Sequence, residues 1–479
     1  MTESVAERTE PLVANPRGRA PSLTLGVLAL IGTVWGIMQP LVAPALPDIA
    51  TQVGVAPSSA TWLLTAFLLS AAIATPIIGR LGDLYGRTQL LLVTVALVIA
   101  GSVLDASAGS LGLLVAGRVL QGFGAGVFPL VFGIARDTFS AERMPHAIGL
   151  ISVTLGIGSG IGVVLSGVIV DNLDYHWIFW LQTVVLALCL LATQALVPPS
   201  RNRTTGTVNW VGAALMGGGL AGILLAVSKA STWGWGSLAT LGCALGGLVL
   251  LTLWTVSERR TRHPLVDMST LRIPAVWTTN LTAVLLGAGM FSAFVLIPPF
   301  AQAPTSTGFG FGASVTTSGL LLLPMALTMF AVGSFAGHIQ HRIGAKASLI
   351  AGSAVSMSAY ALLLVAHDSK LPICVATGVL GVGVALGFSA MANIIVHAVP
   401  GHQTGMATGF NTVARTVGSA VGSALAATLL ANSASSSGPT VSGFNNAFLV
   451  AVIALALSTL TAIAIPTHTK TAAETPSVS

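Results

Sequence analysis

Long apolar runs alternate with short polar stretches along almost the whole chain. Each run holds about 20 residues, which is the length of α-helix that crosses the hydrocarbon core of a bilayer. The fourteen runs lie near residues 23–45, 59–78, 89–106, 111–134, 146–170, 177–197, 209–228, 235–256, 276–299, 313–337, 347–366, 371–397, 404–431 and 443–465. This pattern predicts an all-α polytopic membrane protein with fourteen transmembrane helices.

Composition supports the same class of protein. Of the 479 residues, 54% are hydrophobic and 7% are charged, whereas about a quarter of the residues of an ordinary soluble protein are charged. The 54 glycines suit membrane helices, because small residues let such helices approach closely. Cys189, Cys243 and Cys374 lie in apolar runs without metal-ligand spacing, so we interpret them as packing residues.

The lysines and arginines predict how the chain is oriented, since cytoplasmic loops of membrane proteins collect them. With the N-terminus inside, 16 of the 20 fall on the cytoplasmic side and only Lys229 and Lys370 fall outside. Arg118 and Arg415 lie within helices. We therefore expect a multi-pass protein of the cell membrane with both termini in the cytoplasm. The net charge of +6 follows from this topology and does not indicate nucleic-acid binding.

An internal repeat divides the chain into two halves. A shift of 260 residues aligns the fifth run with the thirteenth and pairs Ala147 with Ala407, Gly149 with Gly409, Val153 with Val413, Gly158 with Gly418, Ser159 with Ser419 and Gly162 with Gly422. The repeat predicts two six-helix bundles of the same orientation with two inserted helices, a plan found in secondary transporters. The expected divisions are a cytoplasmic tail (1–22), the N-terminal bundle (23–200), the inserted helices (201–257), a cytoplasmic linker (258–275), the C-terminal bundle (276–466) and a second cytoplasmic tail (467–479).

A charged stretch, GRLGDLYGRT (79–88), lies at the predicted turn between the second and third helices. Its glycines, Gly79, Gly82 and Gly86, permit a tight turn. Asp83 lies just before a helix N-terminus, where the helix dipole favours a carboxylate, and Arg87 one helical turn later is placed to pair with it. A solvated turn that follows the positive-inside rule is the alternative interpretation.

This stretch resembles the signature loop of the major facilitator superfamily, in its fourteen-helix drug:proton antiporter branch. AGRVLQGFGAGV (116–127) is similar to the fourth-helix motif of that family, and ERRTRHPLVDMSTLR (258–272), NWVG (209–212), WGW (233–235) and GMATGFNTVARTVGSAVG (405–422) resemble further marks of the branch. The resemblance implies a major facilitator fold. It also implies a secondary active transporter that exports hydrophobic small molecules, as in drug or antibiotic efflux, by alternating access and proton antiport.

The resemblance also implies roles for individual residues. The loop glycines with Asp83 and Arg87 would form a conformational latch, completed by Arg136 near the end of the fourth helix. The buried Arg118, followed by Gln121 and Gly122, would couple protons to transport. The second copy of the loop departs from the pattern, with His341 and Ala345 where Asp83 and Arg87 would repeat, so no second latch is expected.

The fifth helix lacks the glycine–proline pair of the family, because GVVLSG (162–167) carries Val163 and Ser166 at the departing positions. We therefore expect a smaller kink. Gly158, Gly162 and Ser166 still lie four residues apart on one face, and together with Gly167 they predict close packing that seals a gate. Helix packing without a gating role is the alternative interpretation.

None of the 14 acidic residues falls in the middle of a predicted helix, and Met38 stands where the branch usually has an aspartate. The intramembrane charges are instead Arg118 and Arg415, and such charges usually face a cavity. We therefore expect an electropositive or neutral cavity and a hydrophobic substrate that is neutral or anionic rather than cationic. The candidate cavity residues are Trp35, Gln39, Trp62, Asn280, Phe291, Asn393, Asn411 and Arg415. The candidate proton carriers, all near helix ends, are Asp48, Asp105, Asp137, His146 and His397.

Motifs of other function classes are absent from the sequence. No phosphate-binding GxxxxGK[ST] occurs, and the glycine-rich GIGSGIG (156–162) lies inside an apolar helix without a preceding strand. We expect no enzyme, no metal and no cofactor, with the proton gradient as the energy source. The expected partners are a hydrophobic small-molecule substrate, protons and the lipid bilayer. We expect the protein to be a monomer. An importer of an organic anion and a membrane sensor that does not transport stay open as alternatives.

Overall fold

The computed structural model describes residues 21–466 except 43, 56, 61, 141–142, 201–206, 262–263, 265, 401–402 and 434–439. All regular secondary structure in these residues is helical. The α-helices are α1 (Pro21–Val42), α2 (Leu46–Val53), α3 (Pro57–Ala60), α4 (Trp62–Tyr85), α5 (Arg87–Ala106), α6 (Leu111–Gly122), α7 (Val127–Thr138), α8 (Met144–Asn172), α9 (His176–Leu196), α10 (Trp210–Trp233), α11 (Leu238–Arg260), α12 (Met268–Leu271), α13 (Pro274–Gln302), α14 (Val315–Leu320), α15 (Leu323–Ile343), α16 (Ala345–Val365), α17 (Lys370–Ala398), α18 (Thr404–Asn432) and α19 (Val441–Ile463). Two short 3-10 helices, η1 (Phe123–Gly126) and η2 (Thr305–Thr307), complete the set.

The fourteen predicted runs correspond to helices throughout. Thirteen helical segments in the described part of the chain are long and apolar enough to cross a membrane, and α8, with 29 residues, covers the remaining run. One predicted run is built from α6, η1 and α7, and another from α14 and α15. The prediction of an all-helical, multi-span fold is confirmed.

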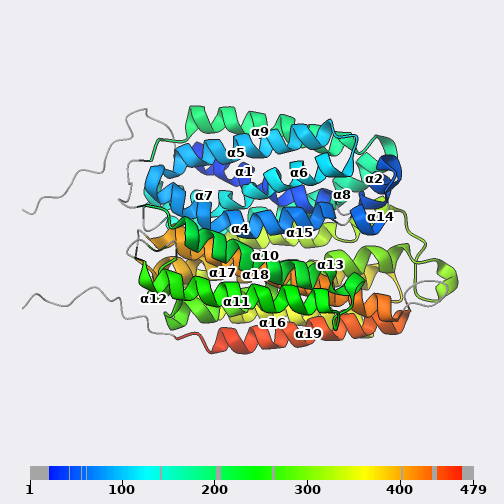
Figure 1. Cartoon of the computed structure of the whole chain (residues 1–479). Coiled ribbons are helices and arrows are strands. Elements are labelled where there is room, and N and C mark those ends of the chain that lie inside the picture. Colours follow the sequence, from blue (N-terminus) through cyan, green and yellow to red (C-terminus); the bar gives the residue numbers. More distant parts are fainter. Residues whose placement is uncertain are drawn as a thin grey trace, which may run out of the picture.

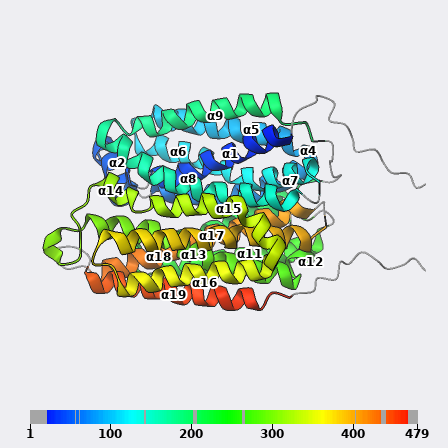
Figure 2. The same cartoon turned by 180° about the vertical axis from the view of Figure 1, so that it is seen from behind.

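The helices form two bundles that lie side by side (Figures 1 and 2). Helices α1 to α9 make the N-terminal half and α13 to α19 make the C-terminal half. The halves meet where α8 packs against α15 and α17, and where α18 packs against α4 and α7. The inserted pair, α10 and α11, lies on one side of this junction, because α10 packs against both α4 and α18.

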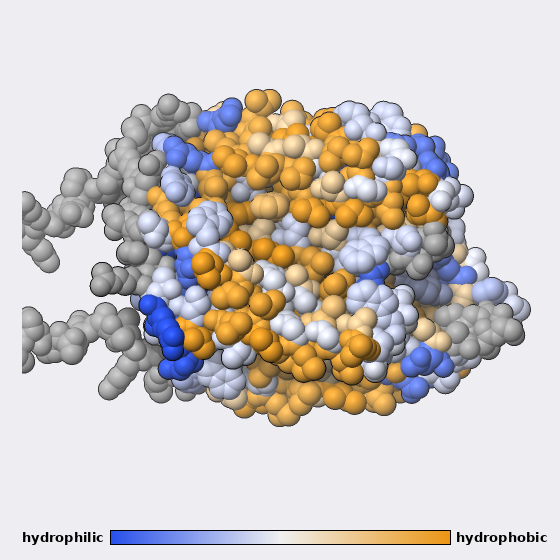
Figure 3. Space-filling view, in the orientation of Figure 1, coloured by the Kyte–Doolittle hydropathy of each residue, from blue (hydrophilic) through white to orange (hydrophobic). Residues whose placement is uncertain are grey.

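The described chain begins and ends at the same end of the bundle, on the left of Figure 1. We call the end that carries Pro21 and Pro466 the basal end, and the end that carries α2 and α14 the distal end. The face in Figure 3 is mainly hydrophobic along the middle of the helices, and hydrophilic residues gather toward the two ends. This distribution is the one expected of helices that cross a bilayer.

Polar contacts join the two inserted helices to each other and to α18. The Asn209 side chain accepts a hydrogen bond from the backbone N–H of Gly212, which caps α10, and donates one of 3.0 Å to buried Glu258 at the end of α11. A Cβ on Gly212 would lie 2.0 Å from the Glu258 carboxylate, so a larger residue there would displace that side chain. At the distal end, the indole N–H of Trp235 donates to Thr428 of α18 over 3.1 Å. The NWVG and WGW motifs therefore hold α10 and α11 in place.

Candidate functional site

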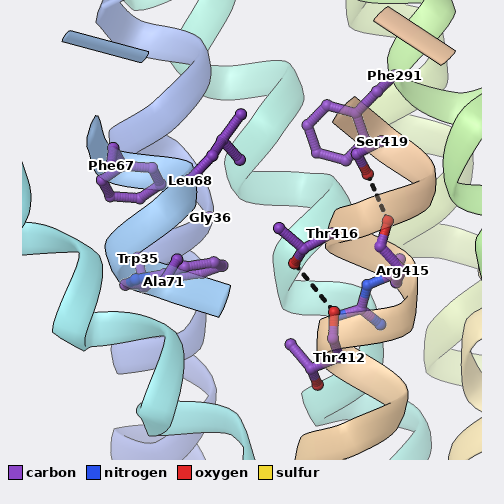
Figure 4. A pocket seen from close by; sticks show the side chains of 10 residues that line it. All are labelled: Trp35, Gly36, Phe67, Leu68, Ala71, Phe291, Thr412, Arg415, Thr416 and Ser419. Atoms are coloured by element: carbon purple, nitrogen blue, oxygen red, sulfur yellow. Dashed lines mark hydrogen bonds between the residues drawn. The ribbon is translucent and has the colours of Figure 1, made fainter. Parts of the chain in front are cut away.

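A cavity lies between the two halves near the middle of the helices. Residues of α1 and α4 face residues of α13 and α18 across it (Figure 4). The lining residues are Trp35, Gly36, Phe67, Leu68, Ala71, Phe291, Thr412, Arg415, Thr416 and Ser419. Its free volume is about 20 Å³, which is room for about one water molecule. The two halves are therefore nearly in contact at this level.

A larger cavity of about 270 Å³ adjoins the first and extends toward the distal end. The two cavities share Leu68 and Phe291. We call this larger cavity the distal cavity. Its walls come from α1, α4, α10, α13 and α18, and the inserted helix α10 supplies Ser228 and Thr232. The lining is mostly apolar with a few hydroxyl groups, and contains no carboxylate. Such a surface suits loosely specific binding of small hydrophobic molecules.

Arg415 is the charged residue of the central cavity. Its guanidinium lies 4.6 Å from the centre of the Phe388 ring, and no hydrogen-bond acceptor for it occurs among the described residues. The hydrogen bond drawn at Arg415 in Figure 4 involves its backbone carbonyl, which accepts from Ser419. The cavity therefore presents a cation whose donors are available to a bound molecule.

Arg118, the other intramembrane arginine, does not line either cavity. It is fully buried in the N-terminal half, where its guanidinium donates to the backbone carbonyls of Leu63 (3.2 Å) and Met38 (3.4 Å). It also donates to the Gln121 side chain over 2.6 Å and lies over the Phe67 ring at 4.2 Å. The prediction that both arginines face the cavity was wrong for Arg118, because surrounding carbonyls and an amide satisfy most of its donors.

The Arg118 environment extends into a buried polar cluster. The Gln121 side-chain amide donates to the Ser102 hydroxyl over 3.0 Å and to the side-chain oxygen of Gln182 over 3.4 Å. These contacts join α5, α6 and α9. Gly122, the third residue of the predicted coupling motif, packs against Phe67 and Ser70 of α4, and a Cβ there would lie 2.6 Å from the Ser70 Cβ. Arg118, Gln121 and Gly122 are thus brought together by one helix face.

Asp105 belongs to the same region, and its burial was not anticipated. The residue has no exposed surface, and neither carboxylate oxygen has a hydrogen-bond partner in the described chain. The carboxylate rests against Gly117, where an added Cβ would lie 2.1 Å from Oδ1. Its position near the end of an apolar run suggested a residue near the membrane surface; only the packing of α6 on α5 encloses it.

A charged network occupies the basal end of the N-terminal half. Arg87 is bonded to Asp83 at 2.9 Å and to Asp137 at 2.9 Å, and also donates to the backbone carbonyl of Gly133. The pairing of Asp83 with Arg87 is the one that their spacing suggested. Gly86 has φ +105°, a conformation that other residues rarely adopt, and a Cβ on Gly82 would lie 2.3 Å from Leu130.

This network reaches across to the C-terminal half at the start of α18. Arg136 donates to the Thr404 hydroxyl, and a Cβ on Gly405 would lie 3.3 Å from both Asp83 oxygens. Gly79 approaches the Gly405 carbonyl, with 3.4 Å for an added Cβ. The predicted latch residues therefore lie at one contact between halves, although the partner seen for Arg136 is Thr404.

The small residues of α8 face two different partners. Gly158 and Gly162 pack on α1, where added Cβ atoms would lie 2.3 Å from the Thr33 carbonyl and 2.8 Å from the Ile37 carbonyl. Gly167 packs on Thr316 of α14, in the other half. Ser166 is fully buried, without a hydrogen-bond partner among the described residues. Only the distal part of this stripe, at Gly167, lies between the halves.

Several predicted cavity residues lie elsewhere. Asn411 donates to Asn280 over 3.0 Å, which joins the two amides between α18 and α13. Asn393 donates to Gln340 over 2.7 Å and lines a separate basal cavity with His397. Trp62 lies under the Lys229 ammonium, 4.5 Å from the ring centre. Trp35, Phe291 and Arg415 do line the central cavity, whereas the side chains of Gln39 and His146 lie outside the described residues.

No cluster of three or more His, Cys, Asp or Glu side chains suited to a metal ion occurs in the part of the chain that the structure describes.

Comparison with known proteins assigns the family. The sequence model of the Major Facilitator Superfamily matches residues 23–310 and 279–478. The multidrug resistance protein Stp of Mycobacterium tuberculosis is 28% identical, covering 80% of this chain and 71% of its own length. The tetracenomycin C resistance and export protein of Streptomyces glaucescens is 27% identical, covering 82% of this chain and 72% of its own.

A solved structure shares the fold. The human organic anion transporter MFSD10 (TETRAN) superposes with a TM-score of 0.67 at 17% identity, over 92% of this chain and 99% of that one. The helices, the two packed halves and the matched family model agree. The chain belongs to the Major Facilitator Superfamily of membrane transporters.

Proposed function

We propose that this transporter exports hydrophobic small molecules that are neutral or anionic, by proton antiport with alternating access. It acts as a monomer in the cell membrane, with its basal end in the cytoplasm. The names of its relatives support export, since they include a multidrug resistance protein and a tetracenomycin C export protein. The excess of lysine and arginine in the basal loops supports the orientation.

The charge of the cavity carries the proposal on substrate class. Arg415 is the ionisable residue among the lining side chains of both cavities, which include no Asp or Glu. A cationic substrate would meet an uncompensated like charge at short range, whereas an anionic group would receive charge-assisted hydrogen bonds. A neutral hydrophobic molecule would use the apolar walls of the distal cavity.

The distribution of contacts supports alternating access. Asp83, Arg136 and Gly79 hold α18 against the N-terminal half at the basal end, while the 270 Å³ cavity lies toward the distal end. Rocking of the two halves about the central cavity would open the basal end and close the distal end, and the reverse motion would restore the arrangement seen here.

Transport by purified protein in liposomes tests the proposal. The probes are anilinonaphthalene sulfonate (anionic), Nile red (neutral) and ethidium (cationic). An antiporter accumulates its substrate in acid-loaded liposomes, because protons leave as the substrate enters. We expect accumulation of the anionic and neutral probes and none of ethidium. Accumulation of ethidium alone would refute the assigned substrate class.

The Arg415→Gln variant tests whether Arg415 is needed for the anionic probe but not for the neutral one. We expect transport of the anionic probe to fall about tenfold, which corresponds to about 1.4 kcal/mol, because the charge-assisted contact is lost. Nile red transport should persist. Arg272→Gln, a change at an exposed basal residue, serves as the matched control. Equal losses for both probes would show that Arg415 does not select the anionic group.

Import of an organic anion is the second candidate, because the free donors of Arg415 would serve it equally. An importer that couples to protons by symport accumulates its substrate when the outside is acidic. Accumulation only under that gradient would favour this candidate. Binding of the probes without movement under either gradient would favour a sensor.

A further inference from the structure

We propose that Asp105 binds and releases the coupled proton, and that Arg118 transmits the protonation state of Asp105 to the substrate cavity. This inference rests on the proposed proton antiport and names the group that performs it. Asp105 lies in the last turn of α5, at the distal end. Arg118 lies on α6, next to the glycine against which the Asp105 carboxylate packs.

Burial and missing hydrogen bonds single out Asp105. The residue is 0% exposed and both its oxygens lack a partner in the described chain. A carboxylate in an apolar interior without donors is unfavourable in its ionised form, so it takes up a proton or draws a cation toward it. Asp105 therefore has two states, a protonated one as packed here and an ionised one that requires Arg118.

Arg118 is placed to serve the ionised state. It is close enough to interact electrostatically with Asp105, and its Nη2 has no hydrogen-bond partner among the described residues. Asp105 takes up the proton from the distal side, and when that proton later leaves the Asp105 oxygen for the basal side, the negative charge attracts this free nitrogen. No other atom or electron changes hands, because the proton is simply bound on one side and released on the other.

The surroundings of Asp105 contain few competing charges. Tyr175, in the segment before α9, is also within electrostatic reach and donates its hydroxyl to the Ala108 carbonyl. Asp48 of α2 is within electrostatic reach of Tyr175, and the His176 ring stacks on the Tyr175 ring. The charged residues of α4 and α7 that face α5 lie at its opposite end, around Arg87, and η1 carries none.

The hydrogen bonds of Arg118 lead from Asp105 to the cavity. Its guanidinium holds the Met38 carbonyl of α1 and the Leu63 carbonyl of α4, and it lies over the Phe67 ring. Phe67 lines the central cavity and stacks with Trp35 at 5.9 Å. Movement of the guanidinium toward an ionised Asp105 loosens these contacts and so changes how α1 and α4 wall the cavity.

Other buried acids of the described chain are already satisfied. Asp83 is bonded to Arg87, and Glu258 accepts from Asn209 and from the Val266 backbone. Asp137 is also paired with Arg87. A proton arriving at any of these would break an existing bond, whereas a proton at Asp105 breaks none.

Asp105→Asn in the full-length chain tests the inference, with Asp368→Asn as the matched control. Asp368 is exposed and also lies at the distal end, in the other half. Liposomes are loaded with acid and given Nile red or anilinonaphthalene sulfonate, and a pH dye records proton movement. We expect Asp105→Asn to lose at least tenfold in accumulation and to abolish probe-evoked proton release. Downhill probe movement at equal pH should continue, because a permanently neutral side chain still permits rocking.

Further measurements distinguish a loss of the titratable carboxyl from misfolding of Asp105→Asn. Asp105→Glu keeps a titratable carboxyl and should restore part of the proton coupling. In detergent, the unmodified chain should release protons on binding the probe in weakly buffered solution, and Asp105→Asn should not. Undiminished acid-driven accumulation by Asp105→Asn would overturn the inference while leaving antiport intact. Absence of acid-driven accumulation by the unmodified chain would overturn antiport itself, and this inference with it.

Discussion

At the scale of single residues, the environment of Arg118 and Asp105 depends closely on packing. The guanidinium is buried and bonded to two backbone carbonyls and one side-chain amide, and the Asp105 carboxylate of α5 packs against Gly117, the residue before Arg118 on α6. The arginine and the glycine beside it are visible in the sequence. Their relation to Asp105 is not, because it depends on the register of α6 against α5.

Gly117→Ala tests that register. An added Cβ would lie 2.1 Å from Asp105 Oδ1 and 2.8 Å from the Gly101 carbonyl, so the two helices must separate. We expect a loss of about 1–3 kcal/mol in stability, as for other overpacked interiors, measured as a lower melting temperature in detergent. Gly112→Ala on the same helix, where nothing lies within 4 Å, should leave the melting temperature unchanged. Equal melting of both variants would contradict the close contact.

At the scale of helices, the basal contact of α4 and α7 with α18 concentrates several polar residues at one junction. Asp83 and Arg136 both reach the first residues of α18, and Arg87 ties Asp83 to Asp137. The N-terminus of a helix favours a nearby carboxylate. Opening the basal end would therefore separate Asp83 from a favourable partner.

Asp83→Asn should slow turnover without changing probe affinity, because the residue lies far along α4 from the cavity residues. We expect turnover to fall about tenfold, which corresponds to about 1.4 kcal/mol in the barrier, with an unchanged dissociation constant for Nile red. Transport rate and equilibrium binding are measured on the same preparation. A weakened affinity at normal turnover would place Asp83 in the binding site and count against a latch.

At the scale of the whole molecule, the inserted helices complete the site and do not merely lengthen the chain. Helix α10 bridges the two halves through α4 and α18, and its residues Ser228 and Thr232 line the 270 Å³ cavity. Ser228 also shares a hydrogen bond of 2.9 Å with Thr65 of α4. A transporter without the inserted helices α10 and α11 would lack the part of the cavity wall that α10 supplies.

Thr232→Phe should narrow the distal cavity from the side of α10. We expect a several-fold loss of transport for both Nile red and anilinonaphthalene sulfonate, because the added ring occupies cavity volume that either probe would fill. Leu241→Phe, on an exposed part of α11, is the control and should transport both probes normally. Normal Nile red transport by Thr232→Phe would exclude α10 from the substrate path.

The sequence by itself determined the class of the fold, the positions of fourteen helices and the pairing of Asp83 with Arg87. Run length, helical spacing and local turn chemistry are properties of neighbouring residues, so they can be read along the chain. Only the tertiary structure decided that Arg415 lines the cavity while Arg118 does not, that Asn411 is hydrogen-bonded to Asn280, and that Asp105 is enclosed. Those outcomes depend on how far each helix is rotated and shifted against helices distant in sequence, and nearly every face of these apolar helices would be acceptable to a bilayer.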